Sequence, residues 1–188
     1  MSLKFAMLGF IDMKPMTGYD LKKMFETSVN FYWSATHSQI YRTLDEMKKD
    51  EWIMEEFIYQ KDLPNKKVFH ATERGKEALY NWIMEPSEIP PIRHKLLVQL
   101  SWADRLPTEE IIKQLNQYGE KLEERLALYD SDEQQKMPNW SRTAKEKFLW
   151  ESILKNGIST YQAELNWIRS TIKGLKNFVN KDIPIDKK

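Results

Sequence analysis

Residues 36–72 read THSQIYRTLDEMKKDEWIMEEFIYQKDLPNKKVFHAT, and a change of hydrophobic period within them decides the fold. In the first part, up to about residue 50, apolar residues recur at spacings of four and three, which predicts a helix with one buried face. In the second part, two runs rich in β-branched and aromatic residues predict strands. Residues 60–67 between the runs contain Pro64 and Asn65, which favour a turn. The sequence therefore predicts a helix and then a β-hairpin, made of the stripe Ile40, Leu44 and Met47 and the strands Trp52–Tyr59 and Val68–Thr72.

Further helices are predicted on both sides of this stretch. Leu3–Ile11 is apolar on nearly all sides, which indicates a short buried helix. Asp20 follows Thr17 at the capping-box spacing, so a second helix begins there. The predicted N-caps of the second, third and fourth helices are Thr17, either Thr36 or Ser34, and Thr72.

The order of elements is helix, helix, helix, strand, strand, helix, which is the order of a winged helix-turn-helix domain. In such a domain the third helix lies in the major groove of DNA and the hairpin contacts phosphates. The outward side of the third helix suits this role, because Arg42 can bind guanine through two hydrogen bonds and Gln39 can bind adenine. The candidate DNA contacts, the last three of them in the turn, are Thr17, Tyr19, Thr36, His37, Ser38, Gln39, Tyr41, Arg42, Lys61, Lys66 and Lys67.

Each of these contacts has a plainer interpretation. A charged outer helix face is commonly only solvated, and lysines are common in polar turns. Tyr41 adjoins Ile40 and can belong partly to the core, while His37 fits a surface histidine as well as a base reader. The order of the elements carries the prediction, and no single residue does.

Several motifs, taken in order, resemble the PadR-type transcriptional regulators. They are Met7–Ile11 (MLGFI), Pro15–Leu21 (PMTGYDL), Ser38–Leu44 (SQIYRTL), Trp52–Ile53 (WI) and Phe69–Gly75 (FHATERG). The resemblance covers about residues 3–85. It implies a regulator, usually a repressor, that binds a pseudo-palindromic operator as a homodimer and reads DNA with the helix of the Ile-Tyr motif. Many members have Pro at the position of Arg42 and Gly at that of Glu51, so we expect an added contact from Arg42 and a different turn at Glu51.

A Pro-rich linker divides the chain. Residues 86–91 hold three of the eight prolines, which separates a DNA-binding domain at 1–85 from a domain at 92–188. The second domain is predicted to be helical throughout, except for a loop at Asp130–Asn139, and to contain antiparallel helices. The whole protein is therefore predicted to be mainly α with a small β-hairpin. The expected stripes are Ile92, Leu96, Leu97, Leu100 and Ala103, and then, after a helix start at Thr108, Ile111, Leu115, Tyr118, Leu122, Leu126 and Tyr129.

The last helix, expected from about Ser141, carries an apolar seam at heptad spacing. Such a seam indicates a helix packed lengthwise against others, either within one chain or between two copies. A seam of ~38 Å outruns a domain of ~100 residues, and the resemblance implies a helical dimerisation domain here. The sequence therefore predicts a homodimer interface formed by Leu154, Ile158, Tyr161, Leu165, Ile168, Ile172, Leu175 and Val179.

The C-terminal part is also rich in aromatic residues. Trp102, Trp150 and Trp167 can form an apolar pocket that stacks a planar aromatic effector. Core packing is the alternative interpretation of each tryptophan. PadR-type relatives sense phenolic acids, drugs or unknown signals, so the resemblance does not select one effector.

Composition argues against several classes of protein. The chain of 188 residues has no cysteine, and its three histidines lie far apart, which leaves no thiolate site and no HxxxH metal motif. Adjacent carboxylates such as Glu109 and Glu110 point about 100° apart on a helix and do not share a site. We therefore expect no enzyme activity, no metal and no cofactor. Because the longest early apolar stretch is too short to span a bilayer and cysteine is absent, we expect a cytoplasmic protein.

The charge balance leaves a second hypothesis open. The whole chain has a formal net charge of +1, and residues 1–85 carry one more acidic than basic residue. Useful DNA affinity then requires a local positive patch, held twice at a fixed spacing by a dimer. The alternative is a winged protein-interaction module without DNA binding.

Overall fold

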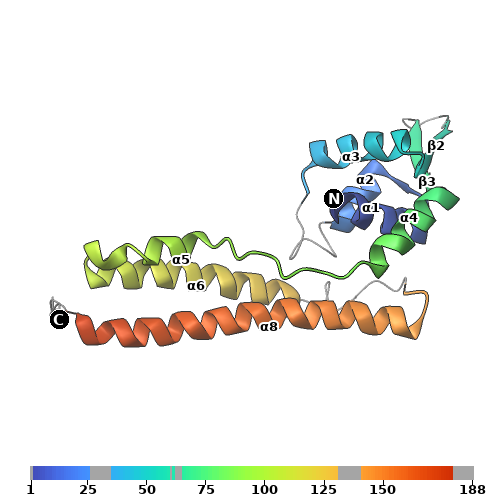
Figure 1. Ribbon diagram of the computed structural model, residues 1–188. Helices are drawn as coiled ribbons and strands as arrows, with labels where there is room; N and C mark the ends of the chain where they lie inside the picture. The colour runs from blue at the N-terminus through green and yellow to red at the C-terminus, as the bar shows by residue number, and fades with distance from the viewer. Residues whose placement is uncertain (1, 26–34, 60, 62–64, 131–140, 180–188) are drawn as a thin grey trace. The chain divides into compact units, whose positions relative to one another are not determined.

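The protein divides into two compact units in the computed structural model, which describes residues 2–25, 35–59, 61, 65–130 and 141–179 (Figure 1). The first unit is Met1–Ile89 and the second is Pro90–Lys188. The division falls within the Pro-rich segment. None of the described helices is long and apolar enough to cross a membrane.

The N-terminal unit has the predicted winged helix-turn-helix order. Its elements are α1 (Ser2–Met13), β1 (Met16–Thr17), α2 (Gly18–Met24), α3 (His37–Lys49), β2 (Ile53–Ile58), β3 (Lys66–Ala71) and α4 (Glu73–Met84). The predicted stripe of α3 is confirmed, since its three side chains are at most 1% exposed. The predicted cap and capping box at Thr17 are confirmed, as is the cap at Thr72. Thr36 caps α3 with a second capping box, and the alternative, Ser34, lies outside the described residues.

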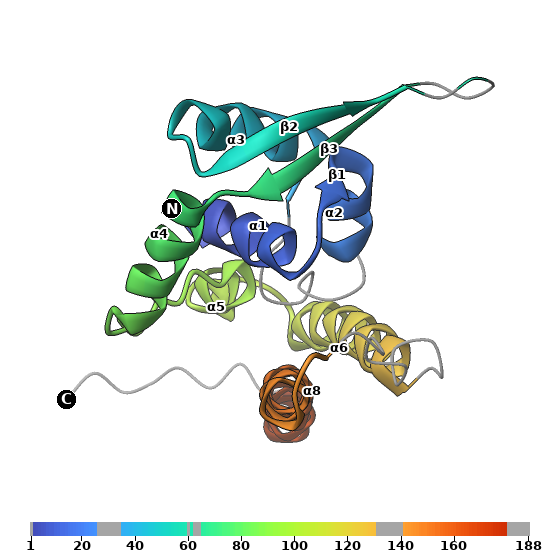
Figure 2. The ribbon, with the colours of Figure 1, turned by 90° about the vertical axis from the view of Figure 1, so that its right-hand side faces the viewer.

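The sheet corrects the sequence prediction in two places. It has three strands in the antiparallel order β1-β3-β2, and the short strand β1 was not predicted. Strand β3 begins at Lys66, so the prediction that Lys66 and Lys67 lie in the turn is wrong. They pair with Ile58 and Phe57 of β2, because ladder hydrogen bonds depend on the backbone and tolerate a lysine whose side chain is exposed. Figure 2 shows that β2 and β3 extend beyond the helices of the unit.

A close junction joins α3, β2 and α4. The backbone N–H of Thr72 donates to the carbonyl oxygen of Trp52 at 2.9 Å, and the Thr72 hydroxyl donates to the carbonyl oxygen of Glu51 at 2.7 Å. Gly75 lies so close that a Cβ atom there would be 2.2 Å from the Trp52 carbonyl oxygen. Glu51 has a φ of 61°, the left-handed conformation that favours glycine. The chain thus holds a glutamate in a conformation that favours glycine, and the expected difference of this turn from that of the PadR-type regulators stays a prediction.

We expect Glu51→Gly to stabilise the N-terminal unit by about 0.5–1 kcal/mol, since glycine adopts this φ without a steric penalty. Loss of the exposed ion pair between Glu51 and Arg74, whose N–O distance is 2.5 Å, offsets a part of the gain. Thermal unfolding followed by circular dichroism measures the change. Glu51→Ala is the control, because it removes the same ion pair and keeps the strained φ. If Glu51→Ala is as stable as Glu51→Gly, backbone strain at residue 51 is not the cause.

The C-terminal unit is built on two long helices that run side by side in opposite directions (Figure 1). Its elements are α5 (Lys95–Leu100), η2 (Ala103–Arg105), α6 (Thr108–Asp130), α8 (Ala144–Leu175) and η3 (Lys176–Phe178). The core between them is apolar and consists of Leu96, Ala103, Ile111, Leu115, Leu122, Leu165 and Ile168. The predicted start of α6 at Thr108 is confirmed.

Several details of this unit differ from the prediction. Residues 92–94 are not helical and Ile92 is 84% exposed, so the first apolar stripe is wrong at its start. Helix α8 begins at Ala144, after an N-cap at Thr143, and Val179 lies beyond its end. Most of the predicted loop at 130–139 lies outside the described residues. Leu165 and Ile168 are buried against α6 of the same chain, with Tyr161, Ile172 and Leu175 packed beside them. This part of the seam is core within one chain, which is the alternative that heptad spacing left open.

Candidate nucleic-acid interface

The outward face of α3 is the first part of the candidate site. The helix buries Ile40, Leu44 and Met47, and Thr43 joins them at 6% exposure. This stripe turns the opposite side of the helix to solvent. All of the predicted contacts that belong to α3 or its cap are exposed, namely Thr36, His37, Ser38, Gln39, Tyr41 and Arg42. The structure therefore brings these predicted residues together on one helix surface.

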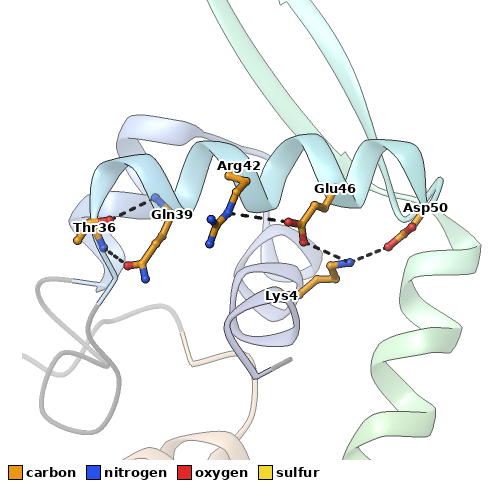
Figure 3. Close-up of polar contacts among 6 residues, drawn as sticks. All are labelled: Lys4, Thr36, Gln39, Arg42, Glu46 and Asp50. Atoms are coloured by element: carbon orange, nitrogen blue, oxygen red, sulfur yellow. Dashed lines mark hydrogen bonds and ion pairs between the residues drawn. The ribbon is translucent and has the colours of Figure 1, made fainter.

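Gln39 has a structural task that the sequence analysis did not assign to it. Its side-chain oxygen accepts the backbone N–H of Thr36 at 2.8 Å, while the Thr36 hydroxyl accepts the backbone N–H of Gln39 at 3.3 Å (Figure 3). These two bonds close the capping box of α3. A two-point contact with adenine uses both the oxygen and the nitrogen of a glutamine amide. Because the Gln39 oxygen already accepts one hydrogen bond in the cap, a contact with adenine would use the second lone pair of that oxygen or open the cap.

A row of ion pairs runs along one flank of α3 to α1. Arg42 Nε lies 4.0 Å from Glu46 Oε1, and Lys4 Nζ lies 3.7 Å from Glu46 Oε2 and 2.7 Å from Asp50 Oδ2 (Figure 3). Lys4 thus fastens α1 to the end of α3. The Arg42 side chain remains 73% exposed, and such an exposed pair contributes little energy. The Arg42 guanidinium is therefore able to exchange Glu46 for a base or a phosphate.

Tyr41 joins α3 to the start of α2. A Cβ atom at Gly18 would lie 2.8 Å from Cζ and from the hydroxyl oxygen of the Tyr41 side chain, so only glycine allows this approach. The Tyr41 ring also lies 4.4 Å from the His37 ring, centroid to centroid, and Tyr41 is 41% exposed. Both interpretations of Tyr41 therefore hold in part, since it packs against Gly18 and is also exposed. Tyr19, on the first turn of α2, is 70% exposed.

A cleft of about 810 Å³ lies between the start of α2, α3 and the hairpin. Aromatic and apolar side chains line part of it, including Tyr19, Tyr41 and Phe69. Its charged lining residues are Asp20, Asp45, Glu55, Lys48, Lys66 and Lys67, which balance in formal charge. A lysine of this cleft can therefore bind an anion only if its ion pair with an acidic residue breaks, or if the acidic residues face away from it.

Glu55 is the acid with the strongest ties to lysine in this cleft. Its carboxylate oxygens lie 2.9 Å from Lys48 Nζ and 2.9 Å from Lys67 Nζ. Hydrogen bonds from these two ammonium groups lower the pKa of Glu55. At Asp20, burial raises the pKa, but hydrogen bonds from Thr17 outweigh it and the net pKa is lowered. Both acids therefore keep their negative charge at neutral pH.

The lysines of the hairpin differ in their surroundings. Lys61, Lys66 and Lys67 are all exposed. Lys67 is paired with Glu55 and also lies over the Phe57 ring, 4.8 Å from its centroid. The far end of the hairpin also exposes apolar side chains, since Phe57 is 53% exposed and Tyr59 is 81% exposed. This end combines cationic and aromatic groups, which suits contact with a nucleic acid backbone and bases.

The three tryptophans predicted for an effector pocket are spread over the C-terminal unit. Trp102 precedes η2 and is 65% exposed, whereas Trp150 and Trp167 are half-buried on α8. Trp167 packs against the core of the unit. Trp150 and Trp167 are on the order of 25 Å apart along the helix axis at 1.5 Å per residue. These two side chains therefore do not line one small pocket within a single C-terminal unit.

A polar cluster in the C-terminal unit was not predicted from the sequence. His94 Nε2 lies 2.5 Å from Glu164 Oε1, and the Tyr118 hydroxyl donates to the same oxygen at 3.0 Å. His94 Nδ1 accepts the backbone N–H of Leu97 at 3.4 Å and so caps α5. Burial and the Glu164 charge raise the pKa of Tyr118 to about 12. The cluster connects α5, α6 and α8. No local motif indicates it, because its members are far apart in sequence.

Two sequence families match the two parts of the chain. Residues 7–81 match the PadR-like family of transcriptional regulators, and residues 92–176 match the family described as virulence activator alpha C-term. The probable transcriptional regulator Rv1176c of Mycobacterium tuberculosis is 36% identical over 105 residues, which are 55% of this chain and 56% of that protein. The negative transcriptional regulator PadR of Bacillus subtilis is 33% identical over 88 residues, or 47% and 48% of the two chains. The chain thus matches about half the length of these curated relatives.

Solved structures are similar over nearly the whole chain. The crystal structure of Bacillus subtilis PadR in complex with operator DNA has a TM-score of 0.82 at 22% identity, and the match covers 93% of this chain and 99% of that one. A PadR-like transcriptional regulator from Bacillus cereus has a TM-score of 0.75 at 26% identity, with 93% and 96% covered. The fold is therefore shared from the winged unit through the C-terminal helices. Residues 7–81 therefore belong to the PadR-like family of transcriptional regulators, and the chain as a whole shares the fold of Bacillus subtilis PadR.

Proposed function

We propose that the protein is a sequence-specific DNA-binding transcriptional regulator, which represses from a pseudo-palindromic operator as a homodimer. The observation that carries the proposal is the exposed outer face of α3, with Arg42 and its neighbours, beside a projecting hairpin that bears lysines. A winged unit of this kind reads bases with the helix and holds the backbone with the hairpin. Two comparisons add support, since the Bacillus subtilis PadR of the same fold is bound to operator DNA and its name describes negative regulation.

The homodimer is proposed to form through the N-terminal half of α8. Phe148, Leu149 and Ile153 lie on this half and are 65%, 50% and 38% exposed. Leu154 and Ile158 of the predicted seam lie beside them and are half-buried. Large apolar groups left exposed along a helix are typical of a protein interface. A second copy that covers this face would hold two α3 helices at the spacing of successive major grooves, which is ~34 Å.

A planar aromatic compound is the proposed effector. Bacillus subtilis PadR, which shares the fold, has been solved in complex with p-coumaric acid. In this chain Trp102 and Trp150 lie outside the buried core and can stack an aromatic ring, singly or across two copies. Titration of the protein with phenolic acids should quench tryptophan fluorescence and weaken operator binding together. Quenching without any loss of DNA affinity would contradict a role in regulation.

Footprinting on the DNA upstream of the protein's own gene tests the proposed function. We expect protection of two half-sites that are about one helical turn apart and are related by an approximate two-fold axis. Protection of a single site, or of every sequence alike, would contradict a dimeric operator-binding regulator.

Arg42 and Lys66 should affect binding in different ways. Arg42→Ala should cost about 1–3 kcal/mol and relax the preference at one base pair of each half-site, because we propose that the exposed Arg42 side chain reads a base. Lys66→Ala should weaken all sequences alike and reduce the salt slope by about one. Fluorescence anisotropy with the footprinted site and with single-base variants of it measures both effects. Unchanged binding by both variants would show that this face does not dock on DNA.

A winged protein-interaction module without DNA binding is the second candidate. One observation favours it, namely the balanced charge of the cleft between α3 and the hairpin. In that case the same anisotropy experiment would show no specific complex, while the exposed apolar groups of the hairpin would still bind a protein partner.

A further inference from the structure

Glu55 links the recognition helix α3 to both strands of the hairpin. It lies on β2, and its side chain is only 13% exposed. One carboxylate oxygen lies 2.9 Å from Lys48 Nζ on α3, and the other lies 2.9 Å from Lys67 Nζ on β3. Lys48 is held further by Asp45 of α3, at 3.0 Å. A chain of ion pairs thus crosses from α3 through β2 to β3.

The position of this link matters because a small change of angle at Glu55 would displace the more distant part of the hairpin. Glu55 pairs with Phe69, which is buried at 4% exposure, so the link lies where the hairpin leaves the core. Beyond it β2 continues to Ile58 and carries exposed side chains. At ~3.3 Å per residue, the stretch from Glu55 to the end of β2 at Ile58 reaches ~10 Å. A tilt of ~10° at Glu55 would then move the end of β2 by ~1.7 Å, which is more than half the length of a hydrogen bond.

We infer that Glu55 is a positioning residue for DNA binding, which fixes the angle between the hairpin and α3 so that both reach the duplex together. This inference rests on the proposed function. The inference explains how an acidic side chain in a DNA-facing cleft can favour binding. If Glu55 holds the hairpin and α3 in place before binding, less conformational entropy is lost when the complex forms. A purely electrostatic view predicts the opposite sign, since removing an acid near DNA strengthens phosphate attraction.

The neighbouring Glu56 provides a matched control. It lies next to Glu55 on β2, is 58% exposed and is paired with His70 of β3 at 2.7 Å. Because successive residues of a strand point to opposite faces, Glu56 lies on the face away from the link. Glu55→Gln and Glu56→Gln therefore change the charge of the same strand equally, and only the first breaks the connection to α3.

The experiment compares these variants on the footprinted operator. We expect Glu55→Gln to weaken binding about tenfold and to lose hydroxyl-radical protection under the hairpin, while guanine N7 protection under α3 from dimethyl sulfate is retained. Glu56→Gln should bind as tightly as the wild-type protein, or more tightly. Equal behaviour of the two variants, or a uniform loss of both kinds of protection by Glu55→Gln, would overturn the inference. Failure of the wild-type protein to form a specific complex would instead overturn the proposed function.

A second variant and a second measurement guard against simple misfolding. Lys48→Met removes the ammonium group on α3 and keeps Glu55, so it should give the same selective loss under the hairpin. Amide hydrogen exchange without DNA should become faster in β2 and β3 of both variants, with the protection of α1 unchanged. Unchanged exchange in the hairpin of Lys48→Met would overturn the inference even if Glu55→Gln does not fold.

Discussion

Gly75→Ala should lower the melting temperature of the N-terminal unit by more than any other glycine-to-alanine change in the described part of that unit. A Cβ atom at this position would lie 2.2 Å from the Trp52 carbonyl oxygen and 3.0 Å from its carbonyl carbon, so backbone must move to admit it. The same carbonyl oxygen accepts the backbone N–H of Thr72 at 2.9 Å, and the backbone N–H of Gly75 donates to the Thr72 hydroxyl at 3.0 Å. Any shift therefore also breaks the cap of α4.

The expected cost is about 3 kcal/mol, from overpacking and from the lost cap. For a unit of this size the cost corresponds to a fall of roughly 12–24 °C in the melting temperature. Gly9→Ala is the matched control, because Gly9 lies inside α1 and a Cβ atom there would meet nothing within 4 Å. Alanine should stabilise that helix by roughly 0.5–1 kcal/mol. Calorimetry of the full chain measures the melting temperature of both variants. A decrease of less than 5 °C for Gly75→Ala, which is about the effect of 1 kcal/mol, would contradict the close packing of α4 on Trp52.

Replacing Leu149 and Ile153 together by glutamate should convert the proposed dimer into a monomer and reduce operator affinity by about 10²–10⁴-fold. Both side chains are exposed on the N-terminal half of α8, so the folded chain accepts the charges, whereas a second copy packed on this face would bury them unpaired. A monomer engages one half-site and loses the advantage of two linked contacts. Analytical ultracentrifugation and anisotropy measure the two effects.

Asn166→Glu is the control for the dimer variant. Asn166 is exposed in the C-terminal half of the same helix, away from the face assigned to the second copy. This variant should remain a dimer with unchanged affinity. If Asn166→Glu dissociates the dimer and the double variant does not, the interface lies at the other half of α8.

The local parts of the fold were predictable from the sequence because they depend on neighbouring residues. Thr17 with Asp20 marks the start of α2, and Thr72 marks the start of α4, since a cap needs only a side chain and the next turn of backbone. The buried stripe of α3 was also predictable, because helical spacing alone places its members on one side. The order of these elements was then enough to predict the winged unit.

The parts that depend on distant residues were not predictable in this way. Strand β1 is only Met16–Thr17, and it exists because it pairs with Phe69 and Val68 more than fifty positions later. The strand residue Lys66 resembled a turn residue, because lysine next to Pro64 and Asn65 carries no strand signal of its own. His94, Tyr118 and Glu164 form one cluster only after three helices have packed.

In the candidate site, too, local features were predictable from the sequence and contacts between distant residues were not. Helical spacing predicted which residues of α3 face outward, and the structure places them there. Helical spacing could not predict that the Gln39 amide closes a cap, or that Glu55 links Lys48 to Lys67, because those contacts depend on side-chain geometry. The heptad seam of α8 likewise predicts a packed face without naming the partner. In the structure Leu165 and Ile168 find that partner in α6 of the same chain.

Salt-dependent anisotropy on the DNA upstream of the protein's own gene tests the central claim most directly. A labelled duplex of that sequence and a scrambled duplex of the same composition are titrated with the full chain at several salt concentrations between about 50 and 200 mM. The account predicts tighter binding to the upstream duplex, with the logarithm of the association constant falling linearly with the logarithm of the salt concentration. Equal affinity for the two duplexes, or no dependence on salt, would contradict a sequence-specific DNA-binding regulator.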